Sequence, residues 1–225
     1  NMNKAHRDRI AFMRVVSGRF DAGKEVYLVQ GGKRIKLSRP QQLMAAEREI
    51  IEEAYAGDII GVFDPGIFSI GDTLCAPGKK FKFDPIPTFA PEHFRRVRPL
   101  DTMKRKQFLK GMEQIAQEGA IQIFKTPYSG MEEVIVGVVG TLQFDVLDYR
   151  LKNEYGVDLY EEGLPYQYLR WIEHDGEEPF RADELTLPND AMLVEDYKGN
   201  QLLLFASLWS INWTADRNKQ LTLLE

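Results

Sequence analysis

Closely spaced prolines divide this sequence into two parts. Pro85, Pro87 and Pro91 lie within the ten-residue segment FDPIPTFAPE. Proline lacks a backbone N–H and has a fixed φ, so such a segment cannot form a helix interior or a central strand. We therefore predict a domain boundary here, with one domain over residues 1–86 and a second over residues 87–225. A chain of 225 residues is long enough for two ordinary domains.

The first predicted domain consists of short apolar stretches that glycines interrupt. Examples are EVYLVQGGKRIKLS and AGDIIGVFDPG. Runs of this length, bounded by turn residues, are typical of β-strands, and several in succession predict a small all-β barrel. Gly31 and Gly32 lie between two such runs and predict a hairpin turn. Asp64-Pro65-Gly66 predicts a second turn, because proline presets φ and glycine accepts a positive φ.

The second predicted domain alternates strand and helix patterns. Asp101 can cap a helix that ends at Gly119, and Thr141 can cap another that ends at Gly156. Apolar residues recur at helical spacing in both segments: Phe108, Met112, Ile115 and Ala116 in the first, and Phe144, Leu147, Leu151 and Tyr155 in the second. With the β-rich runs around them they give the order β-α-β-β-α-β, which predicts a ferredoxin-like α+β sandwich. We interpret residues 163–225 as an additional β-containing extension packed on this domain.

Composition narrows the class of protein. The chain is 44% hydrophobic and 28% charged, as in ordinary globular proteins. It has no apolar run near the ~18 residues of a membrane span and no secretory leader at its start, so we expect a soluble cytoplasmic protein. One cysteine, Cys75, and three scattered histidines, His6, His93 and His174, provide neither an internal disulfide nor a cluster of metal ligands.

No sequence pattern indicates a catalytic site. Gly18 to Lys24 has the spacing of a phosphate-binding loop, but Glu25 stands where that loop needs Ser or Thr, and a strand pattern follows instead of a helix. Asp58 and Asp72 each follow a glycine, where a carboxylate commonly accepts hydrogen bonds from the backbone N–H groups of a turn. We therefore predict no catalytic, cofactor-binding or metal-binding residue in this chain.

Charge is distributed unevenly along the sequence. The net charge is −5, yet the first 112 residues hold 21 Lys and Arg against 13 Asp and Glu, and the remainder holds 8 against 21. This asymmetry suggests that the basic half contacts a polyanion. The candidate RNA-binding residues form three clusters: Lys33, Arg34, Lys36 and Arg39; Arg95, Arg96 and Arg98; and Lys104, Arg105 and Lys106. The alternative, that these side chains are solvated or paired with the acidic half, stays open.

Several segments resemble translation factors. AGDIIG at residues 56–61 and IGDTLC at residues 70–75 resemble the second-domain barrel of translational GTPases. FAPE at residues 89–92, GAIQIF at residues 119–124 and VGTLQFDV at residues 139–146 resemble, more narrowly, the family of bacterial peptide chain release factor three. The similarity covers most of the chain and is strongest before residue 163.

The resemblance implies a role in translation termination. Members of this family are cytoplasmic GTPases that remove class-one release factors from the ribosome after peptide release. The sequence lacks the family's GTP-binding domain, so the resemblance implies that GTP and magnesium bind elsewhere and that this chain is a ribosome-docking portion without enzymatic activity. Its barrel would dock on small-subunit ribosomal RNA, its second domain would face a small-subunit ribosomal protein, and the protein would be a monomer.

Two other functions stay open at the level of sequence. One is a stand-alone enzyme with a ligand pocket between the domains, which ligand-induced thermal stabilisation would reveal. The other is a protein-interaction module whose acidic half recruits a basic partner. Charge reversal at Lys33, Arg34 and Lys36 would abolish RNA docking and leave such an acidic contact intact. If docking neutralises about six phosphates, the affinity for ribosomal RNA should fall with salt with a log–log slope on the order of −4 to −5.

Overall fold

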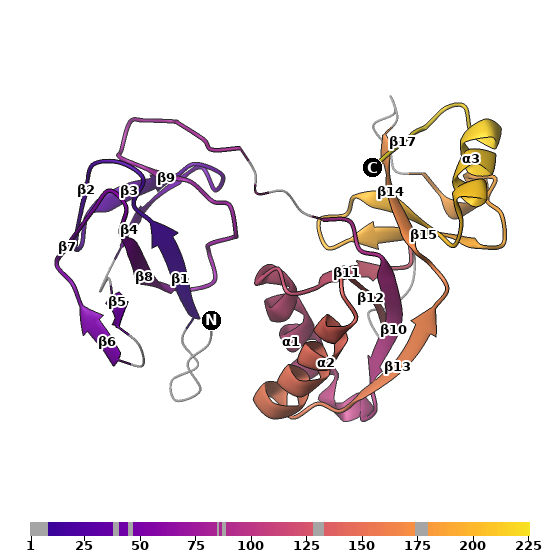
Figure 1. Ribbon diagram of the computed structural model, residues 1–225, viewed down its shortest axis with the longest axis horizontal. Coiled ribbons are helices and arrows are strands. Elements are labelled where there is room, and N and C mark those ends of the chain that lie inside the picture. Colours follow the sequence, from indigo (N-terminus) through magenta and orange to yellow (C-terminus); the bar gives the residue numbers. More distant parts are fainter. Residues whose placement is uncertain are drawn as a thin grey trace. The chain divides into compact units, whose positions relative to one another are not determined.

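The computed structural model divides into two compact units, Asn1–Pro87 and Thr88–Glu225 (Figure 1). It describes residues 9–37, 41–44, 47–84, 86, 89–127, 133–173 and 180–225. The division falls inside the proline-rich segment in which the sequence predicts a domain boundary.

Short antiparallel strands build the first unit. They are β1 (Arg9–Arg14), β2 (Arg19–Asp21), β3 (Glu25–Leu28), β4 (Lys33–Lys36), β5 (Gln41–Met44), β6 (Glu47–Ile50), β7 (Glu53–Tyr55), β8 (Ile59–Asp64) and β9 (Leu74–Cys75). They pair into three small sheets with the strand orders β1-β8-β5-β6, β2-β7 and β4-β3-β9. The all-β class predicted for this region is confirmed.

The three sheets share one apolar core. Phe20, Val26 and Val62 belong to different sheets and are buried in the same cluster. Among the described residues, however, the strand pairs do not close into a barrel. The strands are only two to six residues long, because glycines with positive φ, such as Gly23 at 75° and Gly57 at 105°, turn the chain after a few residues. Among the described residues, the region predicted as a barrel thus consists of three small sheets around a common core.

The turns of the first unit follow the sequence predictions. β3 and β4 form an antiparallel hairpin that turns at Gly32, whose φ is 62°. The carboxylates of Asp58 and Asp72 accept the backbone N–H groups of Tyr55 and Ser69, each at 2.8 Å. The loop with the spacing of a phosphate-binding loop leads into β3, a strand, and not into a helix. These residues therefore shape the fold, as the sequence indicates.

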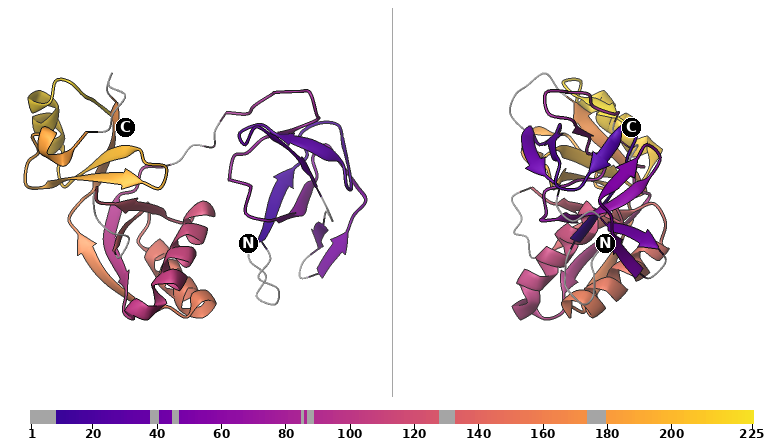
Figure 2. Two further views of the ribbon diagram at one scale, coloured as in Figure 1. Left: turned by 180° about the vertical axis from the view of Figure 1, so that it is seen from behind. Right: turned by 90° about the vertical axis from the view of Figure 1, so that its left-hand side faces the viewer.

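The second unit combines helices with one large antiparallel sheet (Figure 2). Its elements in chain order are β10 (His93–Pro99), η1 (Thr102–Lys104), α1 (Arg105–Gln117), β11 (Gln122–Lys125), β12 (Val134–Val138), α2 (Leu142–Arg150), η2 (Leu151–Tyr155), β13 (Leu159–Leu164), β14 (Tyr168–Glu173), η3 (Ala182–Glu184), β15 (Ala191–Asp196), β16 (Gln201–Phe205), α3 (Leu208–Arg217) and β17 (Thr222–Leu224). The described strands are ordered β13-β10-β12-β11-β15-β16-β14-β17.

The first half of this unit has the predicted β-α-β-β-α-β order. Its strands lie in the order β13-β10-β12-β11 with antiparallel neighbours, and α1 and α2 cover one face of them (Figure 1). Phe108 and Ile115 of α1 and Phe144 and Leu147 of α2 are buried there against Val136. The helical spacing of apolar residues in the sequence therefore identifies the face that packs on the sheet.

The C-terminal part, residues 163–225, continues the same sheet beyond β11. Phe94 and Ile135 of the first half and Leu169, Val194 and Leu204 of the extension are buried in one cluster. This cluster lies on the sheet face opposite α1 and α2, because strand residues alternate between the two faces. The extension is therefore integrated into the second unit through both hydrogen bonding and packing, and it contains the β-structure that the sequence predicts.

Helix α2 begins without the predicted cap. Thr141 makes no side-chain capping bond. Instead, Gln143 Oε1 accepts the N–H groups of Val139 at 3.0 Å and Gly140 at 2.9 Å, and its Nε2 donates to the carbonyl of Ala120 at 2.6 Å. One amide side chain thus holds the two residues that precede the N-cap and ties them to the chain before β11.

Beyond α2, the chain continues through the wider π-turn η2 and ends at Gly156 in a left-handed conformation, with φ 67°. This turn packs closely on α1 at Gly111. A Cβ added there would lie 2.5 Å from Leu151 Cδ2 and 3.0 Å from the ring of Tyr155. Only glycine leaves room for this approach, so Gly111 sets how closely η2 packs on α1.

Candidate nucleic-acid interface

Strand β4 carries three of the predicted RNA-binding residues at the edge of a sheet. It is an outer strand in the order β4-β3-β9. Lys33, Arg34 and Lys36 are all exposed. Arg34 Nη1 lies 3.5 Å from Glu25 Oε1 on the neighbouring strand, and both side chains are exposed. Such a long contact in water contributes little to stability, so these cations can bind an external anion.

Alternation along β4 explains why its cations point outward. Ile35 is paired with Val26 of β3 and packs against the core of the first unit. Its neighbours Arg34 and Lys36 therefore face away from that core, as predicted. Arg39, the fourth predicted member of this cluster, lies outside the described residues.

The sequence prediction missed a basic segment beside the same sheet. It follows β9, which pairs with β3. Its residues alternate in type: the exposed lysines Lys79, Lys80 and Lys82 flank Phe81 and Phe83, whose side chains are 60% and 43% exposed. Alternating cations and aromatic rings are typical of surfaces that contact phosphates and unpaired bases. The signal was present in the sequence as KKFKF.

Local contacts hold this segment in place. Cys75 Sγ donates to the carbonyl of Phe81 at 3.1 Å, and the N–H of Phe83 donates to Thr73 Oγ1 at 3.2 Å. The two phenylalanine rings meet edge to face with their centres 4.8 Å apart. Within the described part of the chain the flanking lysines form no ion pair. The segment therefore presents a fixed aromatic pair between accessible cations.

The second predicted cluster, Arg95, Arg96 and Arg98, does not form one exposed patch. The three residues lie on β10, where alternation directs Arg95 to the helix-covered face and the other two to the opposite face. Arg95 Nη1 lies 2.6 Å from Glu161 Oε2, and its guanidinium lies 4.1 Å from the centre of the Phe144 ring. Arg95 is thus held by an ion pair and an aromatic ring.

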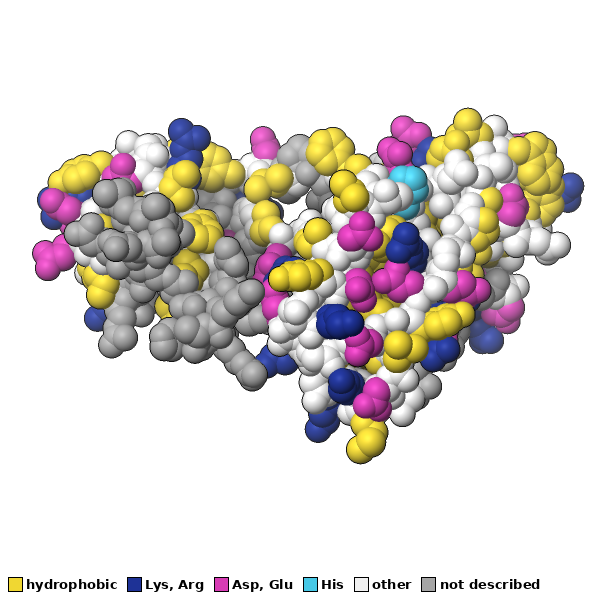
Figure 3. Space-filling view, turned by 60° about the horizontal axis from the view of Figure 1, so that its bottom comes forward, with side chains coloured by type: hydrophobic (Ala, Val, Ile, Leu, Met, Phe, Trp, Pro, Cys, Tyr) yellow, Lys and Arg dark blue, Asp and Glu magenta, His cyan; other side chains and the backbone are white. Residues whose placement is uncertain are grey.

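The other two arginines also have acidic neighbours. Arg96 Nη1 lies 2.9 Å from Glu162 Oε2, and Arg96 and Arg98 approach Glu133 at 3.8 and 3.9 Å. The guanidinium of Arg98 lies 4.3 Å from the centre of the Tyr160 ring. On the face of the second unit in Figure 3, acidic and basic side chains are accordingly interspersed. The expected free cationic cluster is corrected to a set of internal ion pairs.

The third predicted cluster lies where η1 passes into α1. Asp101 caps η1 with its side chain, so α1 begins only at Arg105. Lys104 Nζ donates to the carbonyl of Gly156, at the end of η2, where the helix dipole favours a cation. Lys104 therefore has a hydrogen-bond partner inside the unit and needs no external anion. Arg105 and Lys106 are exposed in the first turn of α1.

Arg150 is a further internal cation of the second unit. Its Nη1 lies 2.7 Å from Glu118 Oε2 and its Nη2 lies 3.0 Å from Glu154 Oε2. The hydrogen bond with Glu154 is the main cause that raises the pKa of Arg150, and Glu118 acts in the same direction. This network links the end of α1 to α2 and η2, so its role is structural.

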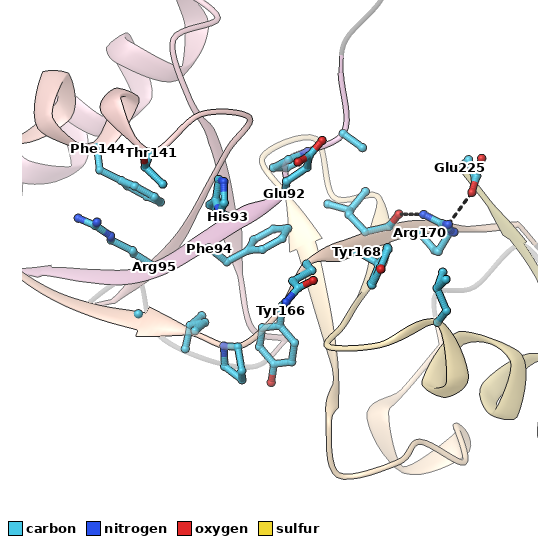
Figure 4. A pocket seen from close by; sticks show the side chains of 18 residues that line it. Glu92, His93, Phe94, Arg95, Thr141, Phe144, Tyr166, Tyr168, Arg170 and Glu225 are labelled. Carbon is cyan, nitrogen blue, oxygen red and sulfur yellow. Dashed lines mark hydrogen bonds and ion pairs between the residues drawn. The ribbon is translucent and has the colours of Figure 1, made fainter.

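A groove of about 900 Å³ lies within the second unit (Figure 4). Phe94, Phe144 and Tyr166 contribute aromatic walls, and Arg170 Nη2 lies 2.6 Å from Glu225 Oε1. Burial raises the pKa of Tyr166. His93, which the sequence places in a strand at the surface, is exposed in β10. The groove is thus lined by aromatic rings and by two ion-paired arginines, Arg95 and Arg170.

No group of three or more His, Cys, Asp or Glu side chains that could hold a metal ion occurs in the described ranges. Among those same residues, no helix is both long enough and apolar enough to cross a bilayer.

Comparisons with known proteins divide the chain at nearly the same place as its two compact units. Residues 1–77 match the family model described as elongation factor G domain 2, and residues 83–215 match that of class II release factor RF3, C-terminal domain. Peptide chain release factor 3 of Symbiobacterium thermophilum is 52% identical over 218 residues, which cover 97% of this chain and 40% of that protein. The proteins of the same name from Listeria welshimeri and Macrococcus caseolyticus are 45% and 41% identical over 223 residues, which cover 99% of this chain and 41% and 42% of those proteins.

The chain spans about two fifths of the length of these relatives. The resemblance seen in the sequence is therefore confirmed at the level of the family and of the two domains matched. Since the model of the C-terminal domain alone covers more than half of the residues, the chain belongs to the peptide chain release factor 3 family.

Proposed function

We propose that this chain is a ribosome-docking portion of a release factor that acts in translation termination, and that its first unit contacts ribosomal RNA. Membership of the family supports the role in termination. The observation that carries the RNA contact is the set of exposed cations on β4, at one edge of the β4-β3-β9 sheet, and in the segment that follows β9, the strand at its other edge. We call this set the basic sheet surface. It consists of Lys33, Arg34, Lys36, Lys79, Lys80 and Lys82.

Release of counterions is the physical basis of this contact. Each accessible Lys or Arg that neutralises a phosphate frees a condensed cation into solution, which favours binding at low salt. Folded RNA is recognised mainly through its backbone and shape, for which the exposed cations of the edge strand β4 are suited. Phe81 and Phe83 add rings on which an unpaired base could stack.

The GTP-dependent step of the family is assigned to a part of the protein outside these residues. The two matching models describe domain 2 and the C-terminal domain, and the relatives are longer than this chain. GTP and magnesium would bind in that other part, and the whole protein would promote recycling of class-one release factors as a cytoplasmic monomer. This chain would bind without carrying out a reaction, with its second unit facing a small-subunit ribosomal protein.

Co-sedimentation with purified ribosomes tests the proposal. The variant Lys33→Glu, Arg34→Glu, Lys36→Glu places three carboxylates on the basic sheet surface. Its affinity should fall by at least about tenfold at moderate salt, because attraction to phosphates becomes repulsion. The amount of chain in the ribosome pellet, measured over a range of ribosome concentrations, gives the affinity.

A charge-matched variant of the second unit serves as the control. Lys152→Glu, Lys198→Glu, Lys219→Glu changes the net charge equally at exposed positions outside the basic sheet surface. This control should bind within about twofold of the unchanged chain, since it alters no phosphate contact. Equal losses in the two variants would show that only net charge matters, and no loss in the first would sink the proposed RNA contact.

A further inference from the structure

Helix α2 is apolar on two opposite sides. One side packs inward, where Phe144 and Leu147 are almost completely buried in the core of the second unit. The other side carries Leu142, Val146 and Tyr149, which are 75%, 49% and 60% exposed. A helix that covers a sheet normally presents polar residues to solvent, so the outward side of α2 has a composition that the fold does not require.

The outward residues form one continuous stripe. Their spacings of four and three residues place them on the same helix face. At about 100° per residue, this face points directly away from Phe144 and Leu147. Val139, which is also exposed, lies three residues before Leu142. We call Leu142, Val146 and Tyr149 the α2 stripe.

Exposed apolar side chains in isolation are common, but a contiguous stripe on one helix usually marks an interaction surface. Tyrosine, here Tyr149, is also enriched among the residues that dominate the binding energy of protein interfaces. Helix α2 covers one face of the sheet of the second unit (Figure 1), and the exposed side chains of the stripe lie on its solvent-facing side. Its residues take no part in the buried cluster that holds α2 to the sheet.

Acidic residues lie along one flank of the stripe. Asp145 and Asp148 are exposed, and neither forms an ion pair within the described residues. Nearby acids differ: Glu118 and Glu154 pair with Arg150, and Asp158 pairs with a lysine of η2. The two aspartates therefore keep their negative charge accessible next to the apolar surface.

We propose that the α2 stripe docks a basic segment of a ribosomal protein whose apolar side chains cover Leu142, Val146 and Tyr149, while its Lys or Arg residues face Asp145 and Asp148. This inference rests on the proposed ribosome docking and names the surface and the chemistry through which the second unit would face a small-subunit ribosomal protein. The charge selects the class of partner. RNA phosphates would be repelled by the two carboxylates, and a symmetric contact between two copies of the chain would bring like charges together.

Photo-crosslinking on purified ribosomes tests this contact. Val146 is replaced by the photoreactive amino acid p-benzoylphenylalanine, and the same replacement at Tyr197, which is 66% exposed in the β15–β16 turn, is the control. After irradiation we expect Val146→benzoylphenylalanine to attach to one ribosomal protein, at a segment rich in Lys and Arg by mass spectrometry. The Tyr197 probe should not give this product.

Two further pairs of substitutions, each made in the chain that carries benzoylphenylalanine at Val146, test the apolar contact and the charge separately. Leu142→Asp with Tyr149→Asp should lower the crosslink yield by about tenfold or more, because it removes the apolar contact. Asp145→Lys with Asp148→Lys should lower it several-fold by reversing the charge. Both variants change exposed residues, so their circular dichroism spectra and melting temperatures should stay close to those of the unchanged chain.

The outcomes separate this inference from the proposed function. A probe chain that sediments with ribosomes but attaches to RNA, to a second copy of itself or to nothing overturns the α2 contact and leaves RNA docking standing. A yield insensitive to both pairs of substitutions also overturns it. A chain that does not sediment with ribosomes at all defeats the proposed docking, and the α2 contact with it.

Discussion

The side-chain hydrogen bonds at the start of α2 come from Gln143 and not from Thr141, which the sequence pattern favours. The Gln143 amide accepts the N–H groups of Val139 and Gly140 and donates to the carbonyl of Ala120. A threonine before an apolar helix is a common cap, so the pattern favours Thr141. The preference for Gln143 depends on the carbonyl of Ala120, which lies 23 residues earlier and is brought close only by the fold.

This assignment predicts unequal effects of two alanine substitutions. Gln143→Ala should lower the free energy of unfolding by about 1–2 kcal/mol, because three backbone groups lose their partner. Thr141→Ala should change it by less than about 0.5 kcal/mol, since its side chain makes no capping bond. Urea unfolding of both variants measures the difference. A larger loss for Thr141→Ala would refute the role given to Gln143.

At the scale of elements, local patterns and long-range pairing differ in how well they can be predicted. Helices α1 and α2 were predictable because their apolar residues repeat at a helical period within the segment itself, whereas α3, in the extension, was not predicted. The ion pairs of Arg95 and Arg96 could not be predicted. Their partners Glu161 and Glu162 lie 66 residues later and meet them only through the register of β10 with β13. The acidic half of the sequence thus neutralises part of the basic half.

The contact of α1 with η2 gives the prediction at this scale. Gly111→Ala should lower the free energy of unfolding by about 1–3 kcal/mol, because the new Cβ would overlap the buried Leu151 side chain and crowd the Tyr155 ring. This loss should occur although alanine is the better helix former by about 1 kcal/mol. Chemical denaturation measures it.

Gly140→Ala is the matched control, because a Cβ added there has no atom within 4 Å and its φ is not positive. Its effect should stay below about 0.5 kcal/mol. If Gly111→Ala were as stable as the unchanged chain or more stable, the close approach of α1 and η2 would not limit the residue at this position.

At the scale of the whole molecule, the division into two units could be predicted because proline excludes regular structure locally. How the strands of the first unit pair could not be predicted, since this pairing depends on hydrogen bonding between strands that are distant in sequence. Of the candidate RNA-binding residues, Lys33, Arg34 and Lys36 are exposed as expected, while Lys104 and the β10 arginines have internal partners. Lys79, Lys80 and Lys82 are exposed cations that the prediction did not include.

The central claim is that the basic sheet surface neutralises phosphates of ribosomal RNA, and the salt dependence of ribosome binding tests it most directly. With about six phosphates neutralised, the logarithm of the affinity plotted against the logarithm of the salt concentration should have a slope on the order of −4 to −5. Removing three cations in Lys33→Gln, Arg34→Gln, Lys36→Gln should make this slope shallower by about 2 to 3. A slope near zero, or one that the three substitutions leave unchanged, would contradict the account.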